Sequence, residues 1–172
     1  LAIHFYGRVE TRSTFAFEYA SQKPASGEGT EASPYLITNN AEFLYINEDN
    51  DAYYRLEADL TFENYVPVCT TSYLSDTIAT DETNPTYAFR GHLDGGGHTI
   101  RYTIASDYYY RTGAGYYGLF GEIYGAATVK DLEIEAHIGD DYGYPQGYYA
   151  GALAGIAHGY GSGGSSGGCS DD

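Results

Sequence analysis

The sequence predicts a single all-β domain built as a solenoid of short stacked strands. Residues 52–62, 98–104 and 127–138 carry apolar side chains with period two in places, which is typical of half-buried strands. Nearly all of the 23 glycines lie in the second half of the chain. Glycine is unfavourable inside helices but suits tight turns between strands, so this distribution favours strands over helices.

An internal repeat supports the stacking of these strands. The stretch YGLFGEIYG at 117–125 aligns with GALAGIAHG at 151–159, so that one leucine and two glycines recur 34 residues later (151 − 117). Repeats of this length are typical of solenoids, in which an inward apolar residue stacks on its equivalent in the next turn.

The chain divides into four segments by composition. Aromatic residues that favour strands occur in residues 1–20, which we expect to form an extended N-terminal arm. Residues 21–33 are polar and rich in proline, glycine and serine, as in a linker. The main domain is expected over 34–160, and a Gly/Ser-rich tail over 161–172.

The beginning of the main domain has a different pattern. A short strand is expected at Pro34–Ile37, followed by a short helix with Asn40 as its N-cap. Phe43, Leu44 and Ile46 would lie on one side of that helix. This would be a helical element within an otherwise β domain.

Several of these stretches together resemble a known family. The run FRGHLDGGGHTI at 89–100, followed by GLFG at 118–121 and VKDLEI at 129–134, looks like the GLUG-type repeats of bacterial cell-surface proteins. The preceding stretches SPYLITNNAEFLYI at 33–46 and YRLEADLTF at 54–62 are similar to the segment that leads into the first repeat of such proteins.

The resemblance covers about residues 33–160 and implies a short right-handed parallel β-helix with roles in adhesion or scaffolding. It also implies an extracellular or cell-surface location. The chain departs from the family in its second repeat, where GSGGSSGGCSDD replaces the expected apolar strand. Few turns of the solenoid would then be present, and its C-terminal end would be poorly capped.

Composition excludes several kinds of partner. The 8 Lys and Arg against 24 Asp and Glu give a net charge of −16, which disfavours nucleic acid and anionic membranes as partners. The apolar runs are far too short to insert into a membrane. The chain contains no methionine and begins with Leu1, so we expect removal of a secretory signal peptide. Cys69 and Cys169 are compatible with one disulfide outside the cell.

Metal and catalytic sites are weakly indicated. The pattern His92-x-Asp94-x-x-x-His98 has metal-ligand residue types, but it lies where a surface turn is expected, so we predict no metal site there. Acidic stretches at 47–51 and 140–141 could bind calcium weakly, and no other cofactor is predicted. No G-x-S-x-G motif or compact acid–base group occurs, so the chain is not expected to be an enzyme.

Two surfaces are candidates for interactions. Two tyrosine-rich clusters lie about one repeat apart and are expected on the same side of the domain, where tyrosine suits an interface or a platform for sugars. The N-terminal arm could add a strand to the next subunit. The tyrosines are Tyr108, Tyr109, Tyr110, Tyr116, Tyr117, Tyr142, Tyr144, Tyr148 and Tyr149, and the residues of the arm are Leu1, Ile3, Phe5, Val9, Phe15, Phe17 and Tyr19.

These features predict a non-catalytic structural subunit of an extracellular filament or surface appendage. It would assemble head-to-tail with copies of itself into a homopolymer, through the arm and the tyrosine-rich loops. The first alternative is a monomeric surface adhesin module that binds surface glycans through the same tyrosines. A β-helix polysaccharide lyase or hydrolase is the third reading.

Overall fold

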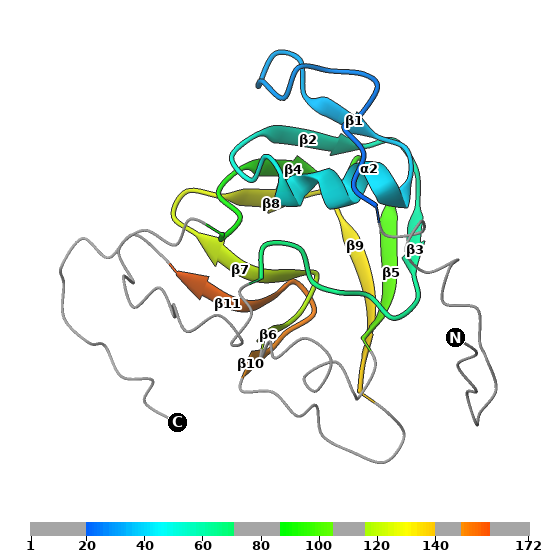
Figure 1. Ribbon diagram of the computed structural model, residues 1–172, viewed down its shortest axis with the longest axis vertical. Coiled ribbons are helices and arrows are strands. Elements are labelled where there is room, and N and C mark those ends of the chain that lie inside the picture. Colours follow the sequence, from blue (N-terminus) through cyan, green and yellow to red (C-terminus); the bar gives the residue numbers. More distant parts are fainter. Residues whose placement is uncertain (1–19, 71–86, 105–115, 140–148, 159–172) are drawn as a thin grey trace, which may run out of the picture.

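A computed structural model gives the structure of the protein and describes residues 20–70, 87–104, 116–139 and 149–158. The predicted N-terminal arm, apart from Ala20, and the Gly/Ser-rich tail lie outside these residues. Short strands predominate, with one helix and one 3-10 turn near the start (Figure 1). In chain order the elements are β1 (Tyr35–Ile37), α2 (Asn40–Leu44), the 3-10 turn η1 (Tyr45–Asn47), β2 (Tyr53–Leu56), β3 (Leu60–Phe62), β4 (His92–Asp94), β5 (Thr99–Ile104), β6 (Tyr116–Tyr117), β7 (Phe120–Tyr124), β8 (Thr128–Lys130), β9 (Glu133–Ile138), β10 (Tyr149–Ala150) and β11 (Ala154–His158).

The strands form four short sheets in which every described pair is parallel. The largest sheet has the order β1-β2-β4-β8, and a second has the order β3-β5-β9. The pairs β10-β6 and β11-β7 form two further sheets of two strands each. Strands that are far apart in the sequence therefore lie side by side, and later strands are added to the outer edge of earlier ones (Figure 1).

The prediction of one short right-handed β-helix is wrong in this form, whereas the predicted N-terminal arm lies outside the described residues. The strands belong to four separate sheets, and α2 lies beside β1 and β3 (Figure 1). The physical reason lies in the turns. Between β4 and β5, Gly96 and Gly97 have φ values of 59° and 80°, a left-handed conformation that suits glycine and redirects the chain from one sheet into another.

Single strands predicted from the sequence are divided in the same way. The stretch 127–138 forms β8 and β9, separated by Asp131 with a φ of 50°. Residues 52–62 form β2 and β3, whereas 98–104 contains one strand, as expected. The repeat is confirmed, because β11 pairs with β7 in parallel with Ala154 opposite Phe120, an offset of 34 residues (154 − 120).

The short helix predicted near Asn40 is present, with its start one residue earlier than expected. Asn39 is the N-cap, and its side chain accepts a hydrogen bond from the Glu42 amide at 3.1 Å. Phe43 is fully buried, and its ring lies 5.6 Å from Phe62 and 6.4 Å from Phe120. The helix therefore anchors one side of the aromatic core.

Glu42 is an acidic residue within this core. It is only 4% exposed, yet its carboxylate accepts hydrogen bonds from the Thr38 amide at 2.7 Å and from the Thr38 hydroxyl at 2.8 Å. Burial by itself would raise the pKa of Glu42. These hydrogen bonds and weaker ones from Ala25 and Asn39 outweigh it, so the pKa lies below its ordinary value.

The folded state should therefore depend on ionised Glu42. Because its pKa is lower in the folded state, the carboxylate stabilises the fold above the pKa of the unfolded chain, and this contribution is lost as the pH falls through the folded pKa. We expect Glu42→Gln to lower the free energy of unfolding by about 1–3 kcal/mol at pH 7 and by less at pH 3. Urea unfolding at both pH values measures this difference.

The matched control is Glu48→Gln, which removes the same charge from an exposed position next to the same helical segment. This control should change the free energy of unfolding very little. An equal loss for Glu42→Gln at pH 7 and pH 3 would contradict a role for the ionised carboxylate.

Candidate functional site

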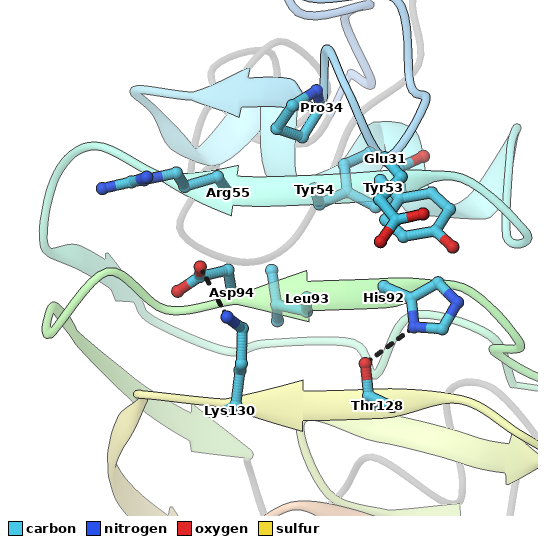
Figure 2. Close-up of a pocket in the computed structure, with 10 residues that line it drawn as sticks. All are labelled: Glu31, Pro34, Tyr53, Tyr54, Arg55, His92, Leu93, Asp94, Thr128 and Lys130. Carbon is cyan, nitrogen blue, oxygen red and sulfur yellow. Dashed lines mark hydrogen bonds and ion pairs between the residues drawn. The ribbon is translucent and has the colours of Figure 1, made fainter.

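A groove of about 450 Å³ lies on the outer face of the four-stranded sheet (Figure 2). It crosses β2, β4 and β8, and residues of the loop before β1 lie at one end. Two rows of side chains form its walls, and each row takes one side chain from each of the three strands. The residues that line it are Glu31, Pro34, Tyr53, Tyr54, Arg55, His92, Leu93, Asp94, Thr128 and Lys130.

The two rows follow from the strand register. Successive side chains of a strand point to opposite faces, so the residues on either side of a buried one share the outer face. The parallel pairing then aligns equivalent positions of three strands. The first row is Tyr53–His92–Thr128, the second is Arg55–Asp94–Lys130, and the inward positions between them are Tyr54, Leu93 and Val129.

The first row has an aromatic character. The rings of Tyr53 and His92 are stacked, with centroids 4.2 Å apart and an interplanar angle of 27°. His92 Nδ1 lies 2.7 Å from Thr128 Oγ1, which fixes the orientation of the imidazole (Figure 2). This row therefore presents ring edges and a hydroxyl group along one wall.

The second row alternates in charge. Lys130 Nζ lies 3.1 Å from Asp94 Oδ2, and the Gly96 amide donates to Asp94 Oδ1 at 2.9 Å. Arg55 Nε lies 3.2 Å from Glu57 Oε1. The hydrogen bond from the Gly96 amide, aided by Lys130 and Arg55, holds the pKa of Asp94 below its ordinary value despite burial, which acts in the opposite direction. Asp94 is therefore an ionised acceptor between two cations.

The sequence pattern around His92 is not brought together as a ligand set. His92 contacts Thr128, whereas His98 Nδ1 lies 3.1 Å from Asp59 Oδ1. Within the described ranges no group of three or more His, Cys, Asp or Glu residues could hold a metal ion. Weak calcium binding stays an untested prediction, because residues 140–141 lie outside those ranges.

The groove was not predicted from the sequence. His92 and Asp94 were considered there only as metal ligands, and Tyr53, Arg55 and Lys130 were not considered as site residues. The available signal was the alternation within the strands, which places Tyr53 and Arg55 on one face. The alignment of three strands could not be read from the sequence, since their separations differ from the 34-residue repeat.

A second surface is formed by the outer edges of β8, β9 and β11, the last strands of three of the four sheets. In the three columns named below, the inward residues of the earlier strands are at most 2% exposed, whereas their partners in β8, β9 and β11 are only half-buried. In each column, the side chain on the last strand is therefore more exposed to solvent than those on the earlier strands. The columns are Tyr54–Leu93–Val129, Leu60–Ile100–Ile134 and Val68–Phe120–Ala154.

The opposite edges are covered by the segment before β2. The Leu36 amide in β1 donates to the Ser26 carbonyl at 3.0 Å. The Asn40 side chain of α2 donates to the Thr61 carbonyl in β3 at 2.7 Å. In the described part of the chain, no backbone hydrogen bond extends outward from β8, β9 or β11. We call the outer edges of β8, β9 and β11 the open end.

Only some of the predicted interface tyrosines can be placed. Tyr116 and Tyr149 stack on paired strands with ring centroids 5.6 Å apart, and Tyr149 is 47% exposed. Tyr117 is fully buried and belongs to the core, so it is not available as a surface contact. The other predicted tyrosines, the arm residues Leu1 to Tyr19 and Cys169 lie outside the described residues.

Cys69, the other half of the predicted disulfide, is a buried free thiol. Burial, together with the nearby carboxylates of Glu122 and Asp51, raises the pKa of this thiol to about 12. The thiolate is therefore scarce at neutral pH, which makes Cys69 unreactive in this state. Pairing with Cys169 stays a prediction.

The strand-rich fold, together with one similarity to a curated protein, fits in coarse terms a surface protein. The chain is similar to Halomucin from Haloquadratum walsbyi, with 32% identity over 113 residues. This similarity covers 64% of the chain but spans only 1% of the length of Halomucin. The chain matches no family model and no solved structure, so its resemblance to GLUG repeats stays a prediction. No helix in the described ranges is long and apolar enough to cross a membrane.

The charge pattern of the groove can be tested by titration. The carboxyl group of Asp94 should titrate below its ordinary value of about 3.9, because the Gly96 amide and Lys130 stabilise its ionised form. Carbon-13 NMR of the side-chain carboxyl group measures the midpoint. Lys130→Gln should raise it, whereas Arg101→Gln, on the second sheet, should leave it unchanged. A wild-type midpoint at or above the ordinary value would contradict the geometry of this row.

Proposed function

We propose that the protein is a non-catalytic structural module of a surface protein that associates end to end with further copies of itself. The observation that supports this proposal best is the difference between its two ends. One end has covered strand edges and a sealed core, and the open end has neither within the described residues. Unpaired parallel edges next to half-buried apolar side chains are a template for adding strands.

The energetic argument rests on the inward columns. A second copy placed on the open end would cover Val129, Ile134 and Ala154 and remove their remaining apolar surface from water. Burial of such surface contributes roughly 25 cal/mol per Å². The outward backbone groups of β8, β9 and β11, for which the described ranges provide no partner, would gain hydrogen bonds in the same contact. Both contributions favour association through this end.

The similarity to Halomucin is compatible with a modular role. The chain corresponds to about one hundredth of that protein, which is the scale of a module within a much larger architecture. The predicted strand arm at residues 1–20 belongs to the same proposal, as a segment that could reach the open end of the next copy.

Replacement of apolar residues at the open end should weaken association. The double variant Val129→Lys and Ile134→Lys places two charges where a second copy would pack, and burial of an unpaired charge is costly. We expect the wild-type chain to increase in mass with concentration, and the double variant to raise the dissociation constant at least about tenfold. Analytical ultracentrifugation over a dilution series measures both.

The matched control is Val66→Lys, because Val66 is an exposed valine (40%) in the segment after β3. Circular dichroism should show that all variants retain the fold. A wild-type chain that stays monomeric at every concentration would refute the proposal. If deletion of residues 1–20 prevents association but the double variant does not, the arm and not the open end forms the contact.

A further inference from the structure

We infer that the groove across β2, β4 and β8 is a binding site for a neutral saccharide of two or three rings. This inference goes beyond the proposed structural role and does not depend on it, because the groove lies on the lateral face and is complete within one copy. It rests on four properties of the walls: hydrogen-bonding capacity, charge balance, aromatic surface and size.

The second row offers donors and acceptors side by side. A lysine ammonium has three donors and an arginine guanidinium has five. Lys130 and Arg55 each make one close ion pair in the structure, with Asp94 and Glu57 respectively, and both remain exposed. Donors are therefore left over for a ligand. Sugar hydroxyl groups are both donors and acceptors, so they match a wall in which cations and a carboxylate alternate.

The charge balance favours a neutral ligand over an acidic one. Arg55 and Lys130 are the cations of the groove, and they are offset by Asp94, Glu57 and Glu31. The region therefore has no excess of positive charge, in a chain whose net charge is −16. An anionic ligand would gain little from the paired cations and would be repelled by the rest of the molecule.

The first row supplies rigid aromatic ring edges and a hydroxyl group for contact with a sugar ring. Tyr53 and His92 form one stacked unit, and the bond to Thr128 holds the imidazole in place. Both rings are half-buried, so their outer edges remain accessible from the groove. Rigid aromatic groups bind at low entropic cost because few rotamers are lost.

The dimensions agree with a short saccharide. Residues two apart in a strand are separated by about 7 Å, which sets the distance between the rows at their bases. Three strands spaced by about 4.8 Å give the groove a length of roughly 10 Å along the rows. Its volume of about 450 Å³ lies in the range of small-molecule sites, and Glu31 and Pro34 of the loop before β1 lie at one of its ends.

Binding can be measured with defined hexasaccharides. Cellohexaose, maltohexaose and laminarihexaose serve as neutral probes, and hexagalacturonate serves as the acidic probe, in calorimetric titrations of the full chain. We expect at least one neutral probe to bind, with an affinity that changes little between 0.1 and 1 M NaCl. Amide NMR shifts should concentrate in β2, β4 and β8. Tyr53→Ala and Arg55→Gln should each weaken binding about tenfold or more.

The control variant is Arg101→Gln. Arg101 is an exposed arginine that pairs with Glu135 on the second sheet, so its replacement removes a similar ion pair outside the groove. It should leave binding unchanged. The inference is wrong if no neutral probe binds, if only hexagalacturonate binds, or if the NMR shifts lie elsewhere. Because the groove lies within one copy and away from the inward columns of the open end, failure of these titrations would leave end-to-end association unaffected, and the converse also holds.

Discussion

In-register parallel pairing is the constraint on which the rest of this structure depends. Each inward side chain of a strand lies opposite its equivalent on the next strand, so that apolar residues form continuous columns. The outward residues are aligned by the same pairing. The core and the groove therefore lie on opposite faces of the same sheet and depend on the same strand register. A shift of that register by a single residue would exchange the residues of the two faces. The strands that form the core are thus the same strands that carry the groove residues.

The sequence predicted the parts of this arrangement that are local or repeated with constant spacing. The strand at 98–104, the short helix with Phe43 on its buried side and the pairing of 117–125 with 151–159 follow from alternation, capping and the 34-residue repeat. The division into four sheets was not predicted. It depends on left-handed turns, and one of these is at Asp131, a residue type that does not by itself indicate such a conformation.

The groove was missed for a related reason. His92 and Thr128 are 36 residues apart, whereas Thr99 and Glu133 are 34 apart, because loops of different length separate the strands. A fixed repeat length cannot align the first pair. Residue types gave little help, since a tyrosine, a histidine and a threonine in different segments carry no common motif. The open end was partly anticipated, because the second repeat lacks its apolar half.

Three buried tyrosines anchor irregular segments of the chain to the core. Their rings pack in the core, while their hydroxyl groups donate to backbone carbonyls of irregular segments: Tyr54 to Asp49, Tyr65 to Leu119 and Tyr102 to Ala152. A main-chain carbonyl is present whatever residue occupies the position. These bonds therefore place no demand on the side chains of Asp49 and Ala152, whereas Leu119 is in addition a buried core residue. Positions 49 and 152 can therefore change their side chains while the bonds that anchor their segments to the core persist.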